Sequence, residues 1–320
     1  MGIDALPAEV VTESCQEGGV EIRDLERLRP LVYRGKLAGR REVVYVKLYE
    51  PERGEAVETV VEIGPEIGLP ESIVVRTDRF VALVSEEATG RPLSHVLPIA
   101  LLPGVWSIER ADLISAYRRL GEYLSTLHAS RETKDGPLLD ERDFEKAIVA
   151  GERTAELLGS RASRRYDRLV RRARDLEGER AIVHSDPSPH NLYYEDGVIE
   201  LIDVACKDAP LVRDRVAVDL GIELMVARLP YGRRSQVEQL TYSYRCGYGR
   251  RATESDAYDL QRLVKLVRLL AYYADGPTTP NAKLTKWTDV PILRDRILQS
   301  LEGTDGKTGR RSGRMATTTT

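Results

Sequence analysis

The segment AIVHSDPSPHNLYYEDGVIELIDVACKD, residues 181–208, constrains the fold of this chain more than any other. An apolar run leads into a polar loop that two prolines interrupt, and two short runs of β-branched and aromatic residues follow. The polar loop holds His184, Asp186, His190 and Asn191. This concentration of acid, amide and imidazole between buried strands indicates a functional site.

The turn that joins the two short runs decides whether Asn191 and Asp203, at their outer ends, can act together. If the turn has three residues, 195–197, the two side chains point to one face of the hairpin. A two-residue turn at Asp196 and Gly197 puts them on opposite faces, unless the strand pairing breaks near the ends. A shared site therefore requires the three-residue turn or such a break.

If the two side chains do meet, an amide oxygen beside a carboxylate offers the hard oxygen ligands that suit Mg²⁺. Asp186 precedes Asn191 in the same loop. It is then free to serve as base or orienting group for a hydroxyl nucleophile. Together these residues predict a phosphoryl-transfer site.

The remainder of the chain divides into a strand-rich part and a helical part. Local patterns predict one helix at 51–66 and strands at 31–39, 42–49, 72–77 and 80–87. From Ile108 onward the apolar residues recur at helical spacing, over 111–129, 144–158, 162–177, 214–228, 235–249 and 255–275. We therefore expect an α+β fold with an antiparallel β-sheet and one helix over 1–88 and a larger, mainly helical part over 89–302. Residues 303–320 have almost no apolar side chains and are expected to form a disordered tail.

The order of polar residues resembles a known family. The pattern H-x-D-x-x-P-x-N, followed by Ile202-Asp203 and by Val-Asp-Leu at 218–220, is similar to the aminoglycoside phosphotransferase family of the protein-kinase-like superfamily. The resemblance implies a two-lobed fold with ATP between the lobes, and it assigns a role to each matching position. Asp186 would be the catalytic aspartate, Asn191 and Asp203 the magnesium ligands, and His184 and Asp219 structural residues that brace the loop.

A kinase-like site also needs a strand lysine for the nucleotide phosphates and a helix glutamate that holds the lysine. Lys47 interrupts the strand pattern EVVYVKLY, where lysine is unfavourable. On the next helix Glu58 is the preferred partner, and Glu55 and Glu62 are alternatives. The segment Glu86, Glu87 and Ala88 resembles the hinge whose main chain contacts adenine.

Three features depart from a protein kinase. No G-x-G-x-x-G precedes Lys47, and the segment 22–30, where such a phosphate loop is expected, has no glycine. Val204-Ala205 follows Asp203 in place of Phe-Gly. The short separation of Asp203 from Asp219 resembles small-molecule kinases and favours a small acceptor over a protein.

The predicted function is therefore an ATP- and Mg²⁺-dependent phosphotransferase that moves the γ-phosphoryl group to a hydroxyl of a small molecule. An atypical protein Ser/Thr kinase and a pseudokinase that only binds nucleotide are the alternatives. A hydrolase with a transition metal held by His184, Asp186, His190 and Asp203 is a rival interpretation, which leaves Lys47 unexplained.

Composition limits the partners and the setting. The net charge of −3 gives no general attraction to nucleic acid, and the three scattered cysteines indicate neither disulfides nor a zinc site. No apolar run is long enough to span a bilayer, so a cytoplasmic protein without a membrane partner is expected. The arginine-rich helix over 162–177 is either a solvated face or an anion-binding wall, which would fit an anionic acceptor.

Overall fold

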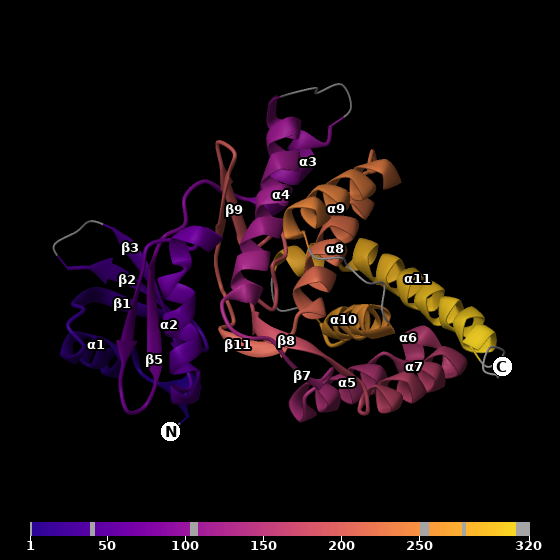
Figure 1. The fold of residues 1–320 in the computed structure, drawn as a ribbon, viewed down its shortest axis with the longest axis horizontal. Coiled ribbons are helices and arrows are strands. Elements are labelled where there is room, and N and C mark those ends of the chain that lie inside the picture. Colours follow the sequence, from indigo (N-terminus) through magenta and orange to yellow (C-terminus); the bar gives the residue numbers. More distant parts are fainter. Residues whose placement is uncertain (1, 39–41, 103–107, 250–255, 277–279, 312–320) are drawn as a thin grey trace, which may run out of the picture. The chain divides into compact units, whose positions relative to one another are not determined.

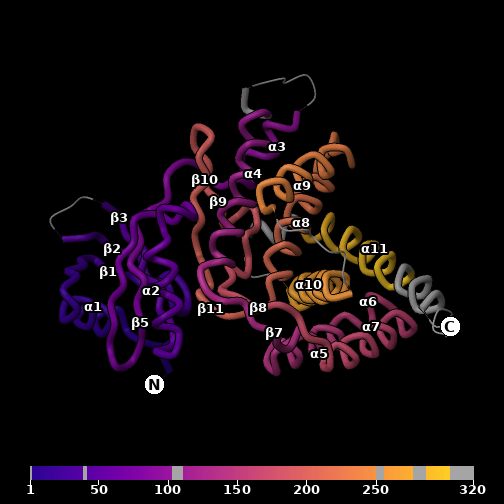
Figure 2. The backbone as a smooth tube through the Cα atoms, viewed as in Figure 1, coloured from indigo at the N-terminus to yellow at the C-terminus, as the bar shows by residue number. Residues whose placement is uncertain are grey.

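The computed structural model describes residues 2–38, 42–102, 108–249, 256–276 and 280–311 (Figures 1 and 2). The chain forms two compact units, each assembled from separate segments. The first comprises Met1–Lys134, Arg180–Met225 and Tyr231–Ala252, and the second comprises Asp135–Glu179, Val226–Pro230 and Thr253–Thr320. All of the predicted site residues belong to the first unit, which is therefore described in more detail.

A five-stranded antiparallel sheet opens the first unit. Its strand order is β1-β2-β3-β5-β4, built from β1 (Ile22–Arg29), β2 (Val32–Leu37), β3 (Val43–Tyr49), β4 (Ser72–Arg76) and β5 (Val81–Glu86). On β3, Val44, Val46 and Leu48 enter the hydrophobic core, so Lys47 belongs to the opposite face of the sheet. The alternation of the sequence thus fixes on which side of the sheet the lysine lies.

Two helices accompany this sheet, whereas the sequence predicted one. Helix α1 (Ala8–Glu17) was not predicted, and it buries Val11 and Cys15, one turn apart, in the same core as β3. Helix α2 (Gly54–Glu62) packs against β4 and β5 and is flanked by the 3₁₀ turns η2 (Pro51–Arg53) and η3 (Gly64–Ile67). These three elements occupy the span predicted as one helix. A further 3₁₀ turn, η1 (Ile3–Ala5), precedes α1.

The rest of the first unit combines short strands with helices. β9 (Leu192–Glu195) pairs with β10 (Val198–Leu201) on one side and β6 (Arg91–Pro92) on the other, and β8 (Glu177–Val183) pairs with β11 (Lys207–Pro210). The helices are α3 (Leu93–Ala100), α4 (Ile108–Ala129), α8 (Val212–Ala227) and α9 (Arg234–Tyr248), of which α4 packs against α9. The last three match predicted helices to within a few residues. The polar loop lies between β8 and β9.

The second unit is mainly helical. It contains α5 (Glu141–Arg153), α6 (Ala155–Leu158), α7 (Ser160–Ala173), α10 (Asp256–Ala274) and α11 (Pro280–Arg311), with β7 (Lys134–Pro137) at its start. Helix α10 packs against α5 and α11, and the arginine-rich α7 buries Tyr166, Val170 and Ala173. Among the described residues, no helix in either unit combines the length and apolar character needed to cross a bilayer.

The predicted fold class, an antiparallel sheet with helix followed by a mainly helical remainder, is confirmed, with α1 as an addition. The boundary at residue 88 stays a prediction, because the compact units are not divided at a single point of the chain. Of the predicted tail, residues up to Arg311 continue α11, and 312–320 lie outside the described residues.

Candidate functional site

The polar loop, residues 184–191, brings two predicted site residues into contact. The side-chain nitrogen Nδ2 of Asn191 donates to the main-chain oxygen of Asp186 at 2.9 Å and to its carboxylate Oδ2 at 3.4 Å. The amide nitrogen is therefore committed as a donor, which leaves Oδ1 as the atom that Asn191 could offer to a metal. Asp186 itself is half-buried.

The hairpin that follows has the two-residue turn, not the three-residue turn. Glu195 pairs with Val198, and the pairing runs to Leu192 and Leu201. The amide of Ile202 still donates to the carbonyl of Asn191 at 3.1 Å, but Asp203 leaves the strand with φ +64°. The pairing thus breaks where a shared site requires it, and aspartate is one of the few residues that adopt this left-handed conformation readily.

A buried carboxylate on α8 fixes the start of the polar loop. Asp214 accepts from the main-chain amides of His184 (2.8 Å) and Ser185 (2.6 Å). Its Oδ2 also lies 3.0 Å from His128 Nε2, and His128 Nδ1 lies 2.7 Å from the hydroxyl of Tyr248. Burial raises the pKa of Asp214, but the His128 contact and the His184 amide outweigh burial and hold that pKa below its ordinary value. An ionised carboxylate can only accept, so His128 donates through Nε2.

His184 is buried inside this arrangement and stays neutral. Burial lowers its pKa, because a charged imidazole would lose its hydration there. Its Nδ1 accepts a long hydrogen bond of 3.4 Å from the amide of Asp186, which places the ring proton on Nε2. Within the described part of the chain, Nε2 has no hydrogen-bond partner. The structural role of His184 stays a prediction, and the burial of its ring among the residues that hold the loop favours it.

Asp219 lies on α8, five residues after Asp214. Its Oδ2 accepts from Arg245 of α9 at 3.2 Å, so it links the two helices. Its predicted role as a brace of the loop stays a prediction, because the loop amides are held by Asp214. Helix α8 also meets the loop at Gly221, where a Cβ atom would lie 2.7 Å from Cδ of Pro189. The close approach of α8 to the loop thus depends on a glycine.

Lys47 reaches the polar residues from the sheet. Its ammonium lies 2.6 Å from Oδ1 of Asp203 and donates to the carbonyl of Val204 at 2.8 Å, and the hydroxyl of Tyr49 donates to the same carbonyl at 2.6 Å. Oδ2 of Asp203 accepts from the guanidinium of Arg29 at 2.9 Å. Burial opposes ionisation of Asp203, but these two cations together lower its pKa below the ordinary value.

The predicted partner of Lys47 is elsewhere. The carboxylate of Glu58 lies 2.8 Å from Nε of Arg76 on β4, and both side chains are about half exposed. Glu55 pairs with Arg131, and Glu62 is exposed. The structure therefore replaces the predicted Lys47–Glu58 pair by a Lys47–Asp203 pair.

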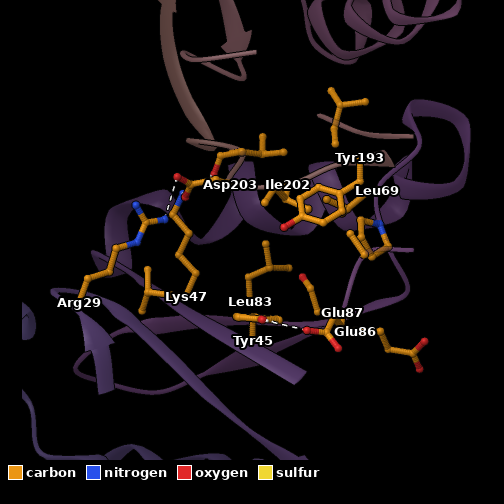
Figure 3. A pocket seen from close by; sticks show the side chains of 16 residues that line it. Arg29, Tyr45, Lys47, Leu69, Leu83, Glu86, Glu87, Tyr193, Ile202 and Asp203 are labelled. Atoms are coloured by element: carbon orange, nitrogen blue, oxygen red, sulfur yellow. Dashed lines mark hydrogen bonds and ion pairs between the residues drawn. The ribbon is translucent and has the colours of Figure 1, made fainter. Parts of the chain in front are cut away.

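A pocket of about 750 Å³, open solvent included, adjoins Lys47 and Asp203 (Figure 3). Arg29, Lys47 and Asp203 gather at one side of it, and Tyr45 and Glu87 lie at the other side, joined by a 3.0 Å hydrogen bond. Its apolar walls come from Val32, Leu69, Pro70, Leu83, Leu201 and Ile202.

The predicted hinge residues Glu86, Glu87 and Ala88 also line this pocket. The amide of Glu86 donates to the carbonyl of Glu71 at 2.9 Å, and the amide of Glu87 donates to that of Val43 at 3.1 Å. Two of the three hinge amides are therefore used within the protein, and Ala88 is the hinge residue whose amide could serve a ligand.

The rival transition-metal site is not formed. Among the described residues, no three or more histidine, cysteine, aspartate or glutamate side chains come together as a metal-binding group. His184 is buried in the loop support, and His190 is exposed. The residues proposed for a hydrolase therefore do not assemble into a ligand set.

Sequence reasoning missed two residues of this site, Asp214 and Arg29. In the sequence Asp214 is one of several charged residues of its helix, and so is Asp219. Arg29 ends a strand in which charged residues predominate, and nothing in its spacing relates it to Asp203. Only the folded arrangement distinguishes either residue from its neighbours.

Comparison with known proteins supports the fold. No protein-family model matches the sequence, and no curated protein sequence matches it. Among solved structures, a glucosamine kinase in complex with glucosamine, ADP and inorganic phosphate aligns with a TM-score of 0.59 at 14% identity, over 94% of this chain and 99% of that one. An amicoumacin kinase in complex with AMP-PNP and Ca²⁺ aligns with a TM-score of 0.56 at 13% identity, over 90% and 93%.

A thermostable mutant of an aminoglycoside phosphotransferase aligns with a TM-score of 0.53 at 14% identity, over 94% of this chain and 100% of that one. At identities this low the likeness establishes the fold. The chain therefore has the protein-kinase-like fold that small-molecule kinases share, as its sequence motifs predict.

Proposed function

We propose that this protein is a phosphotransferase that moves the γ-phosphoryl group of ATP to a hydroxyl of a small molecule. The observation that carries the proposal is the 2.6 Å contact between Lys47 and Asp203, two residues far apart in the sequence that meet beside an open pocket with apolar walls. Asn191 and Asp186, which touch each other, occupy the loop just before the hairpin, and Asp203 follows two residues after the hairpin ends at Leu201.

The pocket has an apolar side and a charged side, which suit the base and the phosphates of a nucleotide. Its apolar walls and the hinge residue Ala88 would hold an adenine ring, and Lys47 at the other side would bind the phosphates. Two of the structural neighbours contain ADP or AMP-PNP. ATP is therefore the proposed phosphoryl donor.

The donor atoms fit a hard divalent cation. Oδ1 of Asn191 and the carboxylate of Asp203 are oxygen ligands of the kind that Mg²⁺ takes, with the rest of its coordination from waters and phosphates. When bound, Mg²⁺ would supply charge neutralisation on the phosphates. The left-handed turn at Asp203 directs this residue out of the hairpin ladder, so the protein holds the ligand at the end of a rigid element.

Asp186 is the proposed group for the acceptor hydroxyl. Its position is fixed twice, by the donation from Asn191 and by the His184 imidazole that accepts from its amide. A carboxylate held in this way can orient the hydroxyl and accept its proton as the phosphoryl group is transferred. Most of the catalytic effect would come from positioning and charge, as in other phosphoryl transfers.

The acceptor is proposed to be a small molecule, because the structural neighbours are kinases of glucosamine, amicoumacin and aminoglycosides. An anionic acceptor stays a prediction. It depends on the arginine-rich helix α7, which belongs to the second compact unit and forms ion pairs there, including Arg171 with Asp167.

The proposal is tested by measuring ADP formation from ATP and Mg²⁺ with a panel of hydroxyl compounds, starting with amino sugars. The purified protein should consume ATP with at least one acceptor, and the Asp203→Asn variant, which lacks the charged ligand, should not. Label from γ-labelled ATP on polypeptide would instead support a protein kinase. ATP binding without transfer to any acceptor would support a pseudokinase.

A further inference from the structure

We propose that Arg29 binds the phosphate groups of the nucleotide and takes the place of a glycine-rich phosphate loop. This inference rests on the proposed function and deepens it, since it assigns a binding role to a residue that was not among the predicted site residues. It comes from the position of one side chain and from the main chain of the turn that carries it.

Arg29 is the last residue of β1 and lies beside the phosphate side of the pocket. It pairs with Val32 across a turn of two residues, Pro30 and Leu31. Its guanidinium reaches Oδ2 of Asp203, while Lys47 holds Oδ1 of the same carboxylate (Figure 3). Two cations from different strands of the sheet therefore converge on one anionic group at the pocket wall.

The turn itself cannot offer a cradle of amides. Pro30 has no N–H, and Leu31 adopts φ +65° although it is not glycine. The carbonyl of Leu31 accepts from the amide of Leu48, so the turn is fixed to β3. Phosphate cradles need several successive N–H groups that point to one place, and a two-residue turn with proline does not supply them. The charge on the phosphates must then be met by side chains.

Arginine is well suited to that task. Its planar fork donates two parallel hydrogen bonds to a phosphate group, with greater specificity than an ammonium. The side chain of Arg29 is 58% exposed, so its pair with Asp203 is weak and can be exchanged for a phosphate. Lys47 is 23% exposed and holds Asp203 and Val204 together, so Arg29 is the cation that is able to move.

The experiment is calorimetric titration of ATP, ADP and adenosine, each with Mg²⁺, into the wild type and three variants. Arg29→Ala removes the fork, Arg29→Lys keeps the charge, and Arg23→Ala is the matched control. Arg23 lies on the same strand, is similarly exposed, pairs with Glu21 and is not part of the pocket wall. Thermal unfolding of each variant confirms that it is folded.

We expect Arg29→Ala to weaken ATP and ADP binding by about 10- to 100-fold, the loss of one charged hydrogen-bonding partner, and to leave adenosine binding unchanged. The affinity of Arg29→Lys for ATP and ADP should lie between those of Arg29→Ala and the wild type, and Arg23→Ala should bind both nucleotides like the wild type. If the wild type binds ATP and Arg29→Ala binds it equally well, or loses adenosine to the same extent, the inference is overturned while the proposed function stands. If the wild type binds neither ATP nor adenosine, the proposed function is overturned together with the inference.

Discussion

The two walls of the site are held in place in different ways. The polar loop is fixed by short-range contacts and by the buried Asp214, whereas two charged residues on the sheet side, Arg29 and Glu58, form ion pairs in which at least one side chain is about half exposed. A buried polar group must find its hydrogen bonds, so its partners are determined by the fold. An exposed ion pair contributes only about 0–1 kcal/mol, so several pairings are close in energy.

The largest expected effect is on kcat, for a substitution of Asp186 in the polar loop. Asp186→Asn should lower kcat by about 10²- to 10⁴-fold, because the amide cannot accept the proton of the acceptor hydroxyl. The free energy of unfolding should change by less than about 1 kcal/mol, because the half-buried amide keeps the shape and one acceptor oxygen. Steady-state kinetics and urea unfolding check both numbers.

If Asp186→Asn kept the turnover of the wild type, Asp186 would not be the group that handles the hydroxyl. A large loss of stability would show instead that Asp186, like Asp214, helps to hold the polar loop in place.

The support of the loop should in turn respond mainly in stability. Asp214→Asn removes a buried charge that accepts from two main-chain amides and from His128. The NH₂ group of the asparagine replaces one carboxylate oxygen, so a donor then faces other donors. We therefore expect a loss of about 3 kcal/mol in the free energy of unfolding. Urea unfolding of this variant beside Asp219→Asn compares the two aspartates of α8. Equal losses of stability for the two variants would contradict the claim that Asp214, rather than Asp219, holds the polar loop.

The same contrast explains how far the sequence predicts the site. Asp186, Asn191 and Asp203 could be proposed as one group because they are separated by short elements whose spacing is visible in the chain and resembles a family motif. Lys47 could be placed because strand alternation fixes its face. Each of these predictions concerns local geometry.

The partners of the charged residues could not be predicted in this way. Glu58 faces Arg76 because β4 runs beside α2, a tertiary neighbour that helix spacing does not reveal. Likewise, Asp214 rather than Asp219 meets the loop because of how α8 packs there, and the helical pattern alone does not distinguish the two. The missed helix α1 has only two buried side chains, so its apolar signal was weak.

A smaller effect is expected from pH. Burial lowers the pKa of His184, so below its ordinary value of 6.5 the unfolded chain takes up a proton that the folded protein does not. Stability from this residue is complete above that pH and declines as the pH falls, by up to about 1.4 kcal/mol per pH unit. Urea unfolding between about pH 7 and about pH 5 should show a shallower pH dependence for His184→Gln than for the wild type. Parallel curves would contradict the buried, neutral state.

The smallest effect is expected on the sheet side, at Glu58. Because its carboxylate pairs with Arg76 and both side chains are about half exposed, Glu58→Gln should change the free energy of unfolding by less than about 0.5 kcal/mol. Turnover should stay within about twofold of the wild type, since Lys47 is positioned by Asp203 and Val204. Glu55→Gln, on the same helix, is the control for a general effect of removing a charge. A loss of more than about tenfold in kcat/KM for Glu58→Gln alone would mean that Lys47 exchanges Asp203 for Glu58 once Asp203 takes up the metal, and the sheet side would then be determined as strictly as the polar loop.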